Sequence, residues 1–239
     1  MESEEPRGSH SPPLQRRQMC GNCDRPIAVC LCHVIPKTPI NTSTRIMIIH
    51  HPHESQHKLN TARLLPKSLR HVTTHLSRKL LHSHLTDQSP STTIYLFPPS
   101  PTAPAVTLSE LKQSLNTNNN LLLIVFDATW KHAKEMVKAS EGILEDLGAV
   151  RACLDVDESV TGGSIYDDEL VLRKEPFKGC VSTLEAVARC LRVIEDEGEE
   201  IERVLIGVLR EMVRLQSGFL KPVKPRPKLL KKCKQNELN

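Results

Sequence analysis

Short apolar runs alternate with amphipathic segments along most of the chain. Three of these runs are rich in β-branched or other apolar residues and have the length of buried strands, at residues 44–50, 92–97 and 121–127. The last one, LLLIVFD, is apolar up to its final residue, which predicts a strand covered on both faces. Further strands are expected at residues 149–156 and, more briefly, at 170–173.

Between these runs, apolar residues recur at the spacing of an α-helix, so that one face of each segment can be buried. Helices are expected at residues 56–65 (ending at Pro66), at 107–115, from Ala133 through Met136, Val137 and Leu144 to a cap at Gly148, at 184–194 and at 201–212. Strands that alternate with helices predict an α/β domain with a mostly parallel sheet.

The length of 239 residues fits one main domain with a small appendage. We expect a disordered leader at 1–18, a cysteine segment at 19–40, the main domain at 41–219 and a basic tail at 220–239. The tail carries seven Lys or Arg residues against one Glu. It can contact phosphates, or it can be a solvated end or a nuclear-import signal, and the sequence leaves these interpretations open.

No stretch reaches the roughly 18 to 20 uncharged apolar residues that a membrane helix needs, and the polar start has no apolar signal-peptide core. We therefore expect an intracellular protein, cytoplasmic or nuclear, without a membrane partner. Aromatic residues make up 3% of the chain, which disfavours a surface that stacks a row of RNA bases.

Four cysteines lie within thirteen positions: Cys20, Cys23, Cys30 and Cys32. Two closely spaced pairs can present four thiolates to one ion, which predicts a tetrahedral zinc site. A four-cysteine site leaves no open position for water or substrate, so the expected role is structural. A redox role of the first pair is the weaker alternative, because such a motif would not need the second pair.

Asp127 directly follows the most apolar strand, and ligands of open α/β sheets bind beyond the carboxyl ends of the strands. Thr129 stands at the start of the next helix, and Trp130 is the only tryptophan. The same residues are also explained without chemistry, because Asp or Thr often caps a helix and a lone tryptophan often fills a core. Position alone does not decide between these interpretations.

The segment Asp127-Ala-Thr-Trp130 resembles the D-x-T-W signature of the DTW-domain family, with Ala128 where many relatives have glycine. Further stretches resemble the family in the same order along residues 20 to 215. They are the cysteine cluster, His51-Pro-His-Glu54, Leu172-Arg-Lys-Glu-Pro176 and Ser182-Thr-Leu-Glu-Ala186.

The resemblance implies a knotted, SPOUT-like fold and an S-adenosylmethionine-dependent aminocarboxypropyltransferase that acts on a uridine of tRNA. It implies catalytic roles for Asp127, Thr129 and Trp130, cofactor binding by Arg173, Ser182, Thr183 and Glu185, and substrate binding by His51 and Glu54. We expect Asp127 to accept or stabilise the loss of the uridine N3 proton.

Several of these residues also have a purely structural explanation. Ser182 and Glu185 match a helix capping box, Arg173 fits a surface ion pair, and Glu54 fits a favourable place at the start of the next helix. No G-x-G-x-x-G follows a strand, which disfavours a Rossmann-type methyltransferase. Two further hypotheses are a transferase that acts on ribosomal RNA and a non-catalytic, zinc-containing RNA-binding module.

Overall fold

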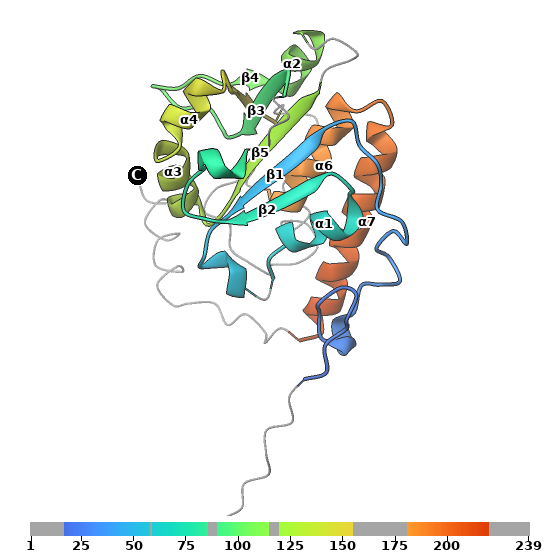
Figure 1. Cartoon of the computed structure of the whole chain (residues 1–239). Coiled ribbons are helices and arrows are strands. Elements are labelled where there is room, and N and C mark those ends of the chain that lie inside the picture. Colours follow the sequence, from blue (N-terminus) through green and yellow to red (C-terminus); the bar gives the residue numbers. More distant parts are fainter. Residues whose placement is uncertain (1–16, 58, 86–89, 115–119, 155–180, 220–239) are drawn as a thin grey trace, which may run out of the picture.

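A computed structural model describes residues 17–57, 59–85, 90–114, 120–154 and 181–219. Its centre is a six-stranded sheet in which all paired strands run parallel, in the order β2-β1-β5-β3-β6-β4 (Figure 1). The strands are β1 (Arg45–His50), β2 (Val72–Leu76), β3 (Thr92–Leu96), β4 (Val106–Thr107), β5 (Leu121–Asp127) and β6 (Val150–Cys153). The expected α/β class with a parallel sheet is confirmed.

Helices cover both faces of the sheet, and strand β5 shows why. Every residue of β5 is buried, and its side chains alternate between the two faces, because successive residues of a strand point to opposite sides. Leu121, Leu123 and Val125 join the core beneath α2, α6 and α7. Leu122, Ile124 and Phe126 join the core beneath α3 and α4.

The α-helices are α1 (Leu65–Ser68), α2 (Leu108–Ser114), α3 (Trp130–Lys138), α4 (Glu141–Asp146), α6 (Thr183–Ile194) and α7 (Gly198–Ser217). Short 3-10 turns are η1 (Ile27–Val29), η2 (Glu54–Gln56), η3 (Ala62–Leu64) and η4 (His82–His84). Among the described residues, no helix combines the length and the apolar character needed to cross a bilayer.

The predicted strands at 44–50, 92–97, 121–127 and 149–156 are confirmed with small differences in their ends. Two strands were not predicted. β2 is an edge strand with a polar Thr-Thr-His centre and partly exposed side chains, and β4 has two residues, so neither shows the apolar pattern of a buried strand. The predicted strand at 170–173, residues 1–16 of the predicted leader and the tail from 220 lie outside the described residues.

The helix predicted at 56–65 is wrong. The chain here forms the turns η2 and η3, and Pro66 lies in the first turn of α1 instead of ending a helix. The side chain of Asn60 explains the change, because its Oδ1 accepts from the backbone N–H of Arg63 at 3.2 Å while its Nδ2 donates to Asp127. Local side-chain bonds of this kind compete with helical backbone bonds.

The helix expected from Ala133 to Gly148 is two helices, α3 and α4, that break at Ser140. Ser140 is buried, its hydroxyl donates to the Met136 carbonyl at 2.6 Å, and the same oxygen accepts from Leu80 N–H at 2.9 Å. The serine thus joins the break to the loop before η4. The predicted C-terminal cap is confirmed, since Gly148 has a φ of +57°.

The two predicted C-terminal helices are confirmed as α6 and α7, which pack closely against each other. The Glu195 carboxylate after α6 accepts from the backbone N–H groups of Ser43 and Thr44 at 3.0 and 2.8 Å, which anchors the segment before β1. The C-terminal end of α6 therefore lies beside the amino end of β1.

Candidate functional site

Three side chains surround the carboxylate of Asp127, the last residue of β5. Asn60 Nδ2 lies 2.7 Å and His50 Nδ1 lies 2.6 Å from Asp127 Oδ2, and Thr183 Oγ1 lies 2.5 Å from Oδ1. Asp127 itself is 5% exposed. The carboxylate is thus a buried acceptor with a donor on each oxygen.

Burial alone would raise the pKa of Asp127, because a charged group is disfavoured away from water. The hydrogen bonds from His50, Thr183 and Asn60 outweigh this effect and leave the pKa of Asp127 below its usual value. Asp127 is therefore ionised at neutral pH and is a weak proton acceptor.

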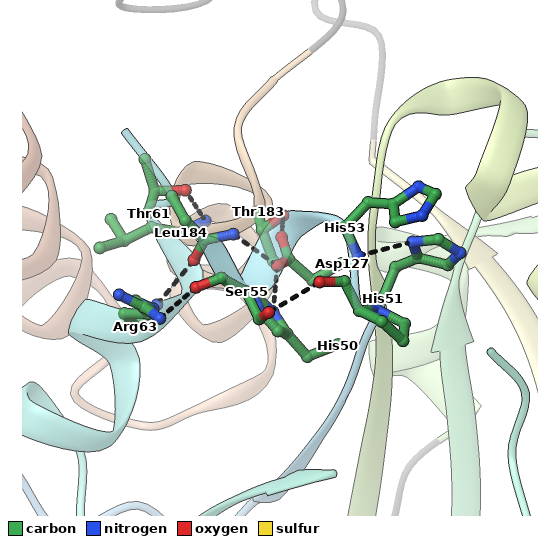
Figure 2. A network of polar contacts seen from close by, with 11 residues as sticks. His50, His51, His53, Ser55, Thr61, Arg63, Asp127, Thr183 and Leu184 are labelled. Atoms are coloured by element: carbon green, nitrogen blue, oxygen red, sulfur yellow. Dashed lines mark hydrogen bonds and ion pairs between the residues drawn. The ribbon is translucent and has the colours of Figure 1, made fainter. Parts of the chain in front are cut away.

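The same three bonds join segments that are distant in the sequence. His50 ends β1, Asn60 lies between η2 and η3, and Thr183 is the first residue of α6. In Figure 2, Asp127 lies between Thr183 and the rings of His51 and His53. Asp127 is not a helix cap, and its contacts organise the edge of the sheet.

Thr129 is the residue before α3, but its hydroxyl makes no capping bond to the backbone. Its Oγ1 instead lies 3.1 Å from Nδ1 of His132. Trp130 begins α3, and its ring centroid lies 6.0 Å from that of Phe97. The Arg151 guanidinium lies over the Phe97 ring, 5.1 Å from its centroid. Two aromatic rings, from residues that follow β3 and β5, thus lie together with a cationic side chain of β6.

His51 follows β1 and is buried, and its backbone N–H donates to the Asp127 carbonyl at 3.0 Å. Its ring is stacked on that of His132, with centroids 4.3 Å apart and planes 7° apart, and His53 meets both rings edge-on. Glu54 is also buried and begins η2. The structure thus brings His51 and Glu54 to the edge that holds Asp127.

Ser182 caps α6, since its hydroxyl accepts from Glu185 N–H at 3.3 Å, and this half of the expected capping box is confirmed. The Glu185 carboxylate is fully buried and pairs with Arg189 at 2.6 Å. The N-terminus of α6, where the helix dipole favours an anion, lies next to Asp127 through Thr183, and the N–H groups of Leu184 and Glu185 already donate to Thr61 and Ser182. Arg173 lies outside the described residues.

The four cysteines predicted to bind metal converge. Their sulfur atoms all lie within 4.8 Å of one another, with Cys20 and Cys32 at 3.4 Å and Cys23 and Cys30 at 3.7 Å. Tetrahedral zinc with Zn–S bonds of ~2.3 Å separates its sulfurs by ~3.8 Å, so the donor set fits zinc. Backbone N–H groups of Cys23 and Asn22 lower the pKa of the Cys20 thiol to about 6, which favours the thiolate.

The cysteine segment is attached to the main domain at several points. Leu31 and Ile35 belong to the core beneath α6 and α7. His33 pairs with Glu211 of α7 at 2.9 Å, and Asp24, whose φ is +56°, pairs with Lys67 of α1 at 2.8 Å. The cysteine segment is therefore attached to both α1 and α7.

Sequence reasoning identified Asp127, Thr129 and His51 but missed His50, Asn60 and His132 as their partners. Asn60 was assigned to a helix, and only the placement of its segment against β5 shows what its amide contacts. His132 carried a usable signal, because it stands three residues after Thr129 and side chains at that spacing meet on a helix.

These features define a parallel α/β protein with a four-cysteine cluster that could hold a metal ion and a polar centre at the carboxyl ends of β1 and β5. The family model described as the DTW domain matches residues 17–217, and the chain belongs to this family.

Three relatives carry names that agree with this family. The chain is 63% identical over 237 residues to tRNA-uridine aminocarboxypropyltransferase A of Arabidopsis thaliana, covering 93% of this chain and 89% of the relative. It is 31% identical to tRNA-uridine aminocarboxypropyltransferase 2 of Drosophila melanogaster, covering 87% and 79%. The Mus musculus protein of that name is 27% identical, covering 94% and 76%. No solved structure is significantly similar to the chain.

Proposed function

We propose that the chain is a tRNA-uridine aminocarboxypropyltransferase, which moves the 3-amino-3-carboxypropyl group of S-adenosylmethionine to N3 of a uridine and releases methylthioadenosine. The observation that carries the proposal is the 63% identity, over nearly the whole chain, to a relative of that name. The cluster around Asp127, in the family's signature segment, supplies a site of suitable polarity.

The reaction needs a donor held with one particular carbon facing the base. The N3–H bond breaks and its proton passes to water. The N3 electron pair forms a bond to the methylene carbon, and the electron pair of the broken carbon–sulfur bond stays on sulfur. Positioning decides which of the three carbons on sulfur is attacked. We assign the α6 N-terminus, with Ser182 and Thr183, to the carboxylate of the donor, and Arg173 to the same group.

Glu185 is buried beneath this helix start and pairs with Arg189, which supports a positioning role for it. Asp127 also fits a positioning role better than proton transfer, because its pKa is lowered and both of its oxygens accept hydrogen bonds. In this proposal Asp127 fixes β1, the Asn60 segment and α6 relative to one another. Thr129 and Trp130 shape the pocket for the base.

The uridine N3 edge is paired in a duplex, so we propose that the target lies in an unpaired loop of tRNA or is turned out of the stack. The basic tail from residue 220 is a candidate for phosphate contact. For the four cysteines we propose structural zinc. We also propose the knotted, SPOUT-like topology that the resemblance to the DTW-domain family implies, for which the parallel sheet is a suitable base.

The test incubates the purified chain with tRNA and S-adenosylmethionine labelled in the amino acid part, followed by mass spectrometry of the nucleosides. We expect labelled aminocarboxypropyluridine in tRNA, equimolar methylthioadenosine, and loss of both with Asp127→Ala. Circular dichroism and metal content verify that this variant is folded. Transfer to ribosomal RNA alone would favour the related alternative, and RNA binding without transfer would reduce the chain to a binding module.

A further inference from the structure

The stacked rings of His51 and His132 lie at the end of β1 and in the first turn of α3, directly beside the segment that carries Asp127. One ligand nitrogen from each of His51, His53 and His132 lies within 4.8 Å of the others. Three histidine nitrogens at such distances could in principle hold a second metal ion, but the geometry of the rings argues against a shared ion.

A metal ion binds imidazole in the plane of the ring, at ~2.0–2.1 Å from the nitrogen. The rings of His51 and His132 are stacked with their planes 7° apart and their centroids 4.3 Å apart, so one ion cannot lie in both planes. In addition, the backbone N–H of His53 donates to His51 Nδ1 at 3.2 Å, which occupies the lone pair of that nitrogen. The observed arrangement therefore does not fit a shared ion.

The bond from His53 also fixes the proton of His51. A neutral imidazole has one N–H and one lone pair, and because Nδ1 accepts from the backbone, Nε2 carries the hydrogen. Burial first, and then the neighbouring His132, His53 and Arg78, lower the pKa of His51, whereas Glu54 acts in the opposite direction. His51 is thus a neutral side chain with a directed N–H donor.

A neutral donor at this place has a defined use in the proposed reaction. When uridine N3 loses its proton, the negative charge spreads onto the carbonyl oxygens on either side of it. A preorganised N–H group that contacts such an oxygen stabilises this charge, and the effect is large where water is excluded. A neutral imidazole can act as such an electrophile.

We propose that His51 is a catalytic residue that donates from Nε2 to a uracil carbonyl oxygen adjacent to N3, and so stabilises the deprotonated base that attacks the donor. The inference rests on the proposed function. The N3 proton passes to water, and the electron pair left on N3 forms the bond to the methylene carbon. The electron pair of the broken carbon–sulfur bond remains on sulfur. His132 is a positioning residue that stacks on His51, and Thr129 holds its ring through Nδ1.

The proposal also explains selection of uracil. Cytosine carries no proton on N3 and has an amino group in place of O4, so a contact from His51 to O4 would meet an acceptor in uracil and a donor in cytosine. An N–H group of His51 at that edge would meet a second N–H group, and a site built for one hydrogen-bond pattern rejects its mismatch.

The experiment compares His51→Ala and His51→Gln with wild type on two tRNA transcripts, one with uridine and one with 5-fluorouridine. Fluorine withdraws electrons and makes N3–H more acidic, so the second RNA depends less on a stabilising donor. We expect His51→Ala to lower kcat on the uridine RNA by about 100-fold or more, as for the loss of one such donor. On the 5-fluorouridine RNA the loss should be at least tenfold smaller, an expectation on the order of that for a one-unit change in pKa.

His51→Gln keeps an N–H donor, so it should retain more activity on uridine RNA than His51→Ala. The pH dependence of kcat should shift to higher pH in His51→Ala, because the bound base then loses its proton less readily. His82→Gln is the matched control, since His82 is exposed on η4, and it should behave as wild type. Affinity of each variant for tRNA, measured by filter binding, separates loss of donation from loss of binding.

The outcomes of the proposed function and of this inference are distinguishable. Absence of transfer by wild type on both RNAs overturns the proposed function. Transfer by wild type, with equal losses on both RNAs in His51→Ala, gives His51 a structural role and overturns the inference. A second metal equivalent per chain in wild type that is absent in His132→Phe also overturns it, because the histidines would then be ligands.

Discussion

Thr183 Oγ1 donates to Asp127 Oδ1 at 2.5 Å and so joins the first residue of α6 to the last residue of β5. The two bonded residues are 56 positions apart in the sequence, and residues 155–180 between them lie outside the described part of the chain. The hydrogen bond is therefore a long-range contact that forms only when α6 is docked against β5.

Thr183→Val removes this donor while keeping the shape of the side chain. We expect the free energy of unfolding to fall by about 1–3 kcal/mol, the usual cost of leaving a buried polar group short of a partner. Transfer to tRNA should fall as well, because Asp127 no longer fixes the start of α6. Urea unfolding and a transfer assay measure the two effects.

Thr183→Ser is the matched control, because it keeps the hydroxyl and should retain most of the stability and activity. A loss in the serine variant together with wild-type behaviour of the valine variant would show that the methyl group, and not the hydrogen bond, is what matters at this position.

The apolar runs predicted the sheet well because burial on both faces leaves a continuous signal, as in β5, where all residues are buried. Strand β2 lacks this signal, because an edge strand needs no apolar centre. Its middle residues Thr73 and Thr74 are exposed. Periodicity also missed the break at Ser140, because the apolar stripe of α3 continues into α4 while one buried hydroxyl interrupts the backbone.

The sequence singled out Asp127 as a candidate site residue, but it did not reveal which side chains contact its carboxylate. Asp127 could be identified because its strand is so apolar and a parallel sheet exposes that end. The donors to its carboxylate come from His50, Asn60 and Thr183, which are brought together by strand order and helix docking. No local spacing encodes such contacts, so the proposal that Asp127 positions neighbouring segments instead of accepting a proton needed the structure.

Removal of the metal from the cysteine site should loosen the N-terminal segment and α7. We expect about one zinc per chain, to be measured by elemental mass spectrometry, and its loss in Cys23→Ser, because three thiolates and a hydroxyl bind zinc weakly. The melting temperature should fall with Cys23→Ser and with a strong chelator, because metal binding contributes to folding.

Cys153→Ser is the control for this experiment, since Cys153 ends β6 and is not part of the four-cysteine cluster. It should keep the same metal content as wild type. Full metal content in Cys23→Ser would contradict the assignment of the site.

Two glycines of α7 should respond in opposite directions to replacement by alanine. A Cβ on Gly198 would lie 2.3 Å from the Arg192 carbonyl oxygen and 2.6 Å from that of Leu191, so the backbone would have to shift. Gly198→Ala should therefore destabilise the protein by about 1–3 kcal/mol, as overpacking does. Denaturant unfolding measures the change.

Gly207 lies within the same helix, and a Cβ there would meet nothing within 4 Å. Gly207→Ala should stabilise the protein by about 0.5–1 kcal/mol, because alanine favours the helix over the unfolded chain. If both variants lost stability equally, the close approach at Gly198 would not be the reason for its glycine.

Stability should fall on mild acidification, in part through His51. Its pKa is lowered from 6.5 by burial and by the facing His132, His53 and Arg78, against the opposing charge of Glu54. The folded state thus binds this proton less tightly than the unfolded chain. The contribution of neutral His51 to the free energy of unfolding is complete above a pH of about 6.5. It is lost as the pH falls from there through the lower pKa of His51 in the folded state.

Free energies of unfolding at several pH values between about 5 and 8 test this expectation. His51→Gln should show a smaller decrease toward acid than wild type, while the exposed His82→Gln should show the wild-type slope. Burial also lowers the pKa of His75 and His84, so part of the decrease should persist in His51→Gln. Identical slopes in wild type and His51→Gln would mean that His51 binds its proton as readily in the folded protein as in the unfolded chain. That result would remove the support that its neutral form gives to a role as a hydrogen-bond donor.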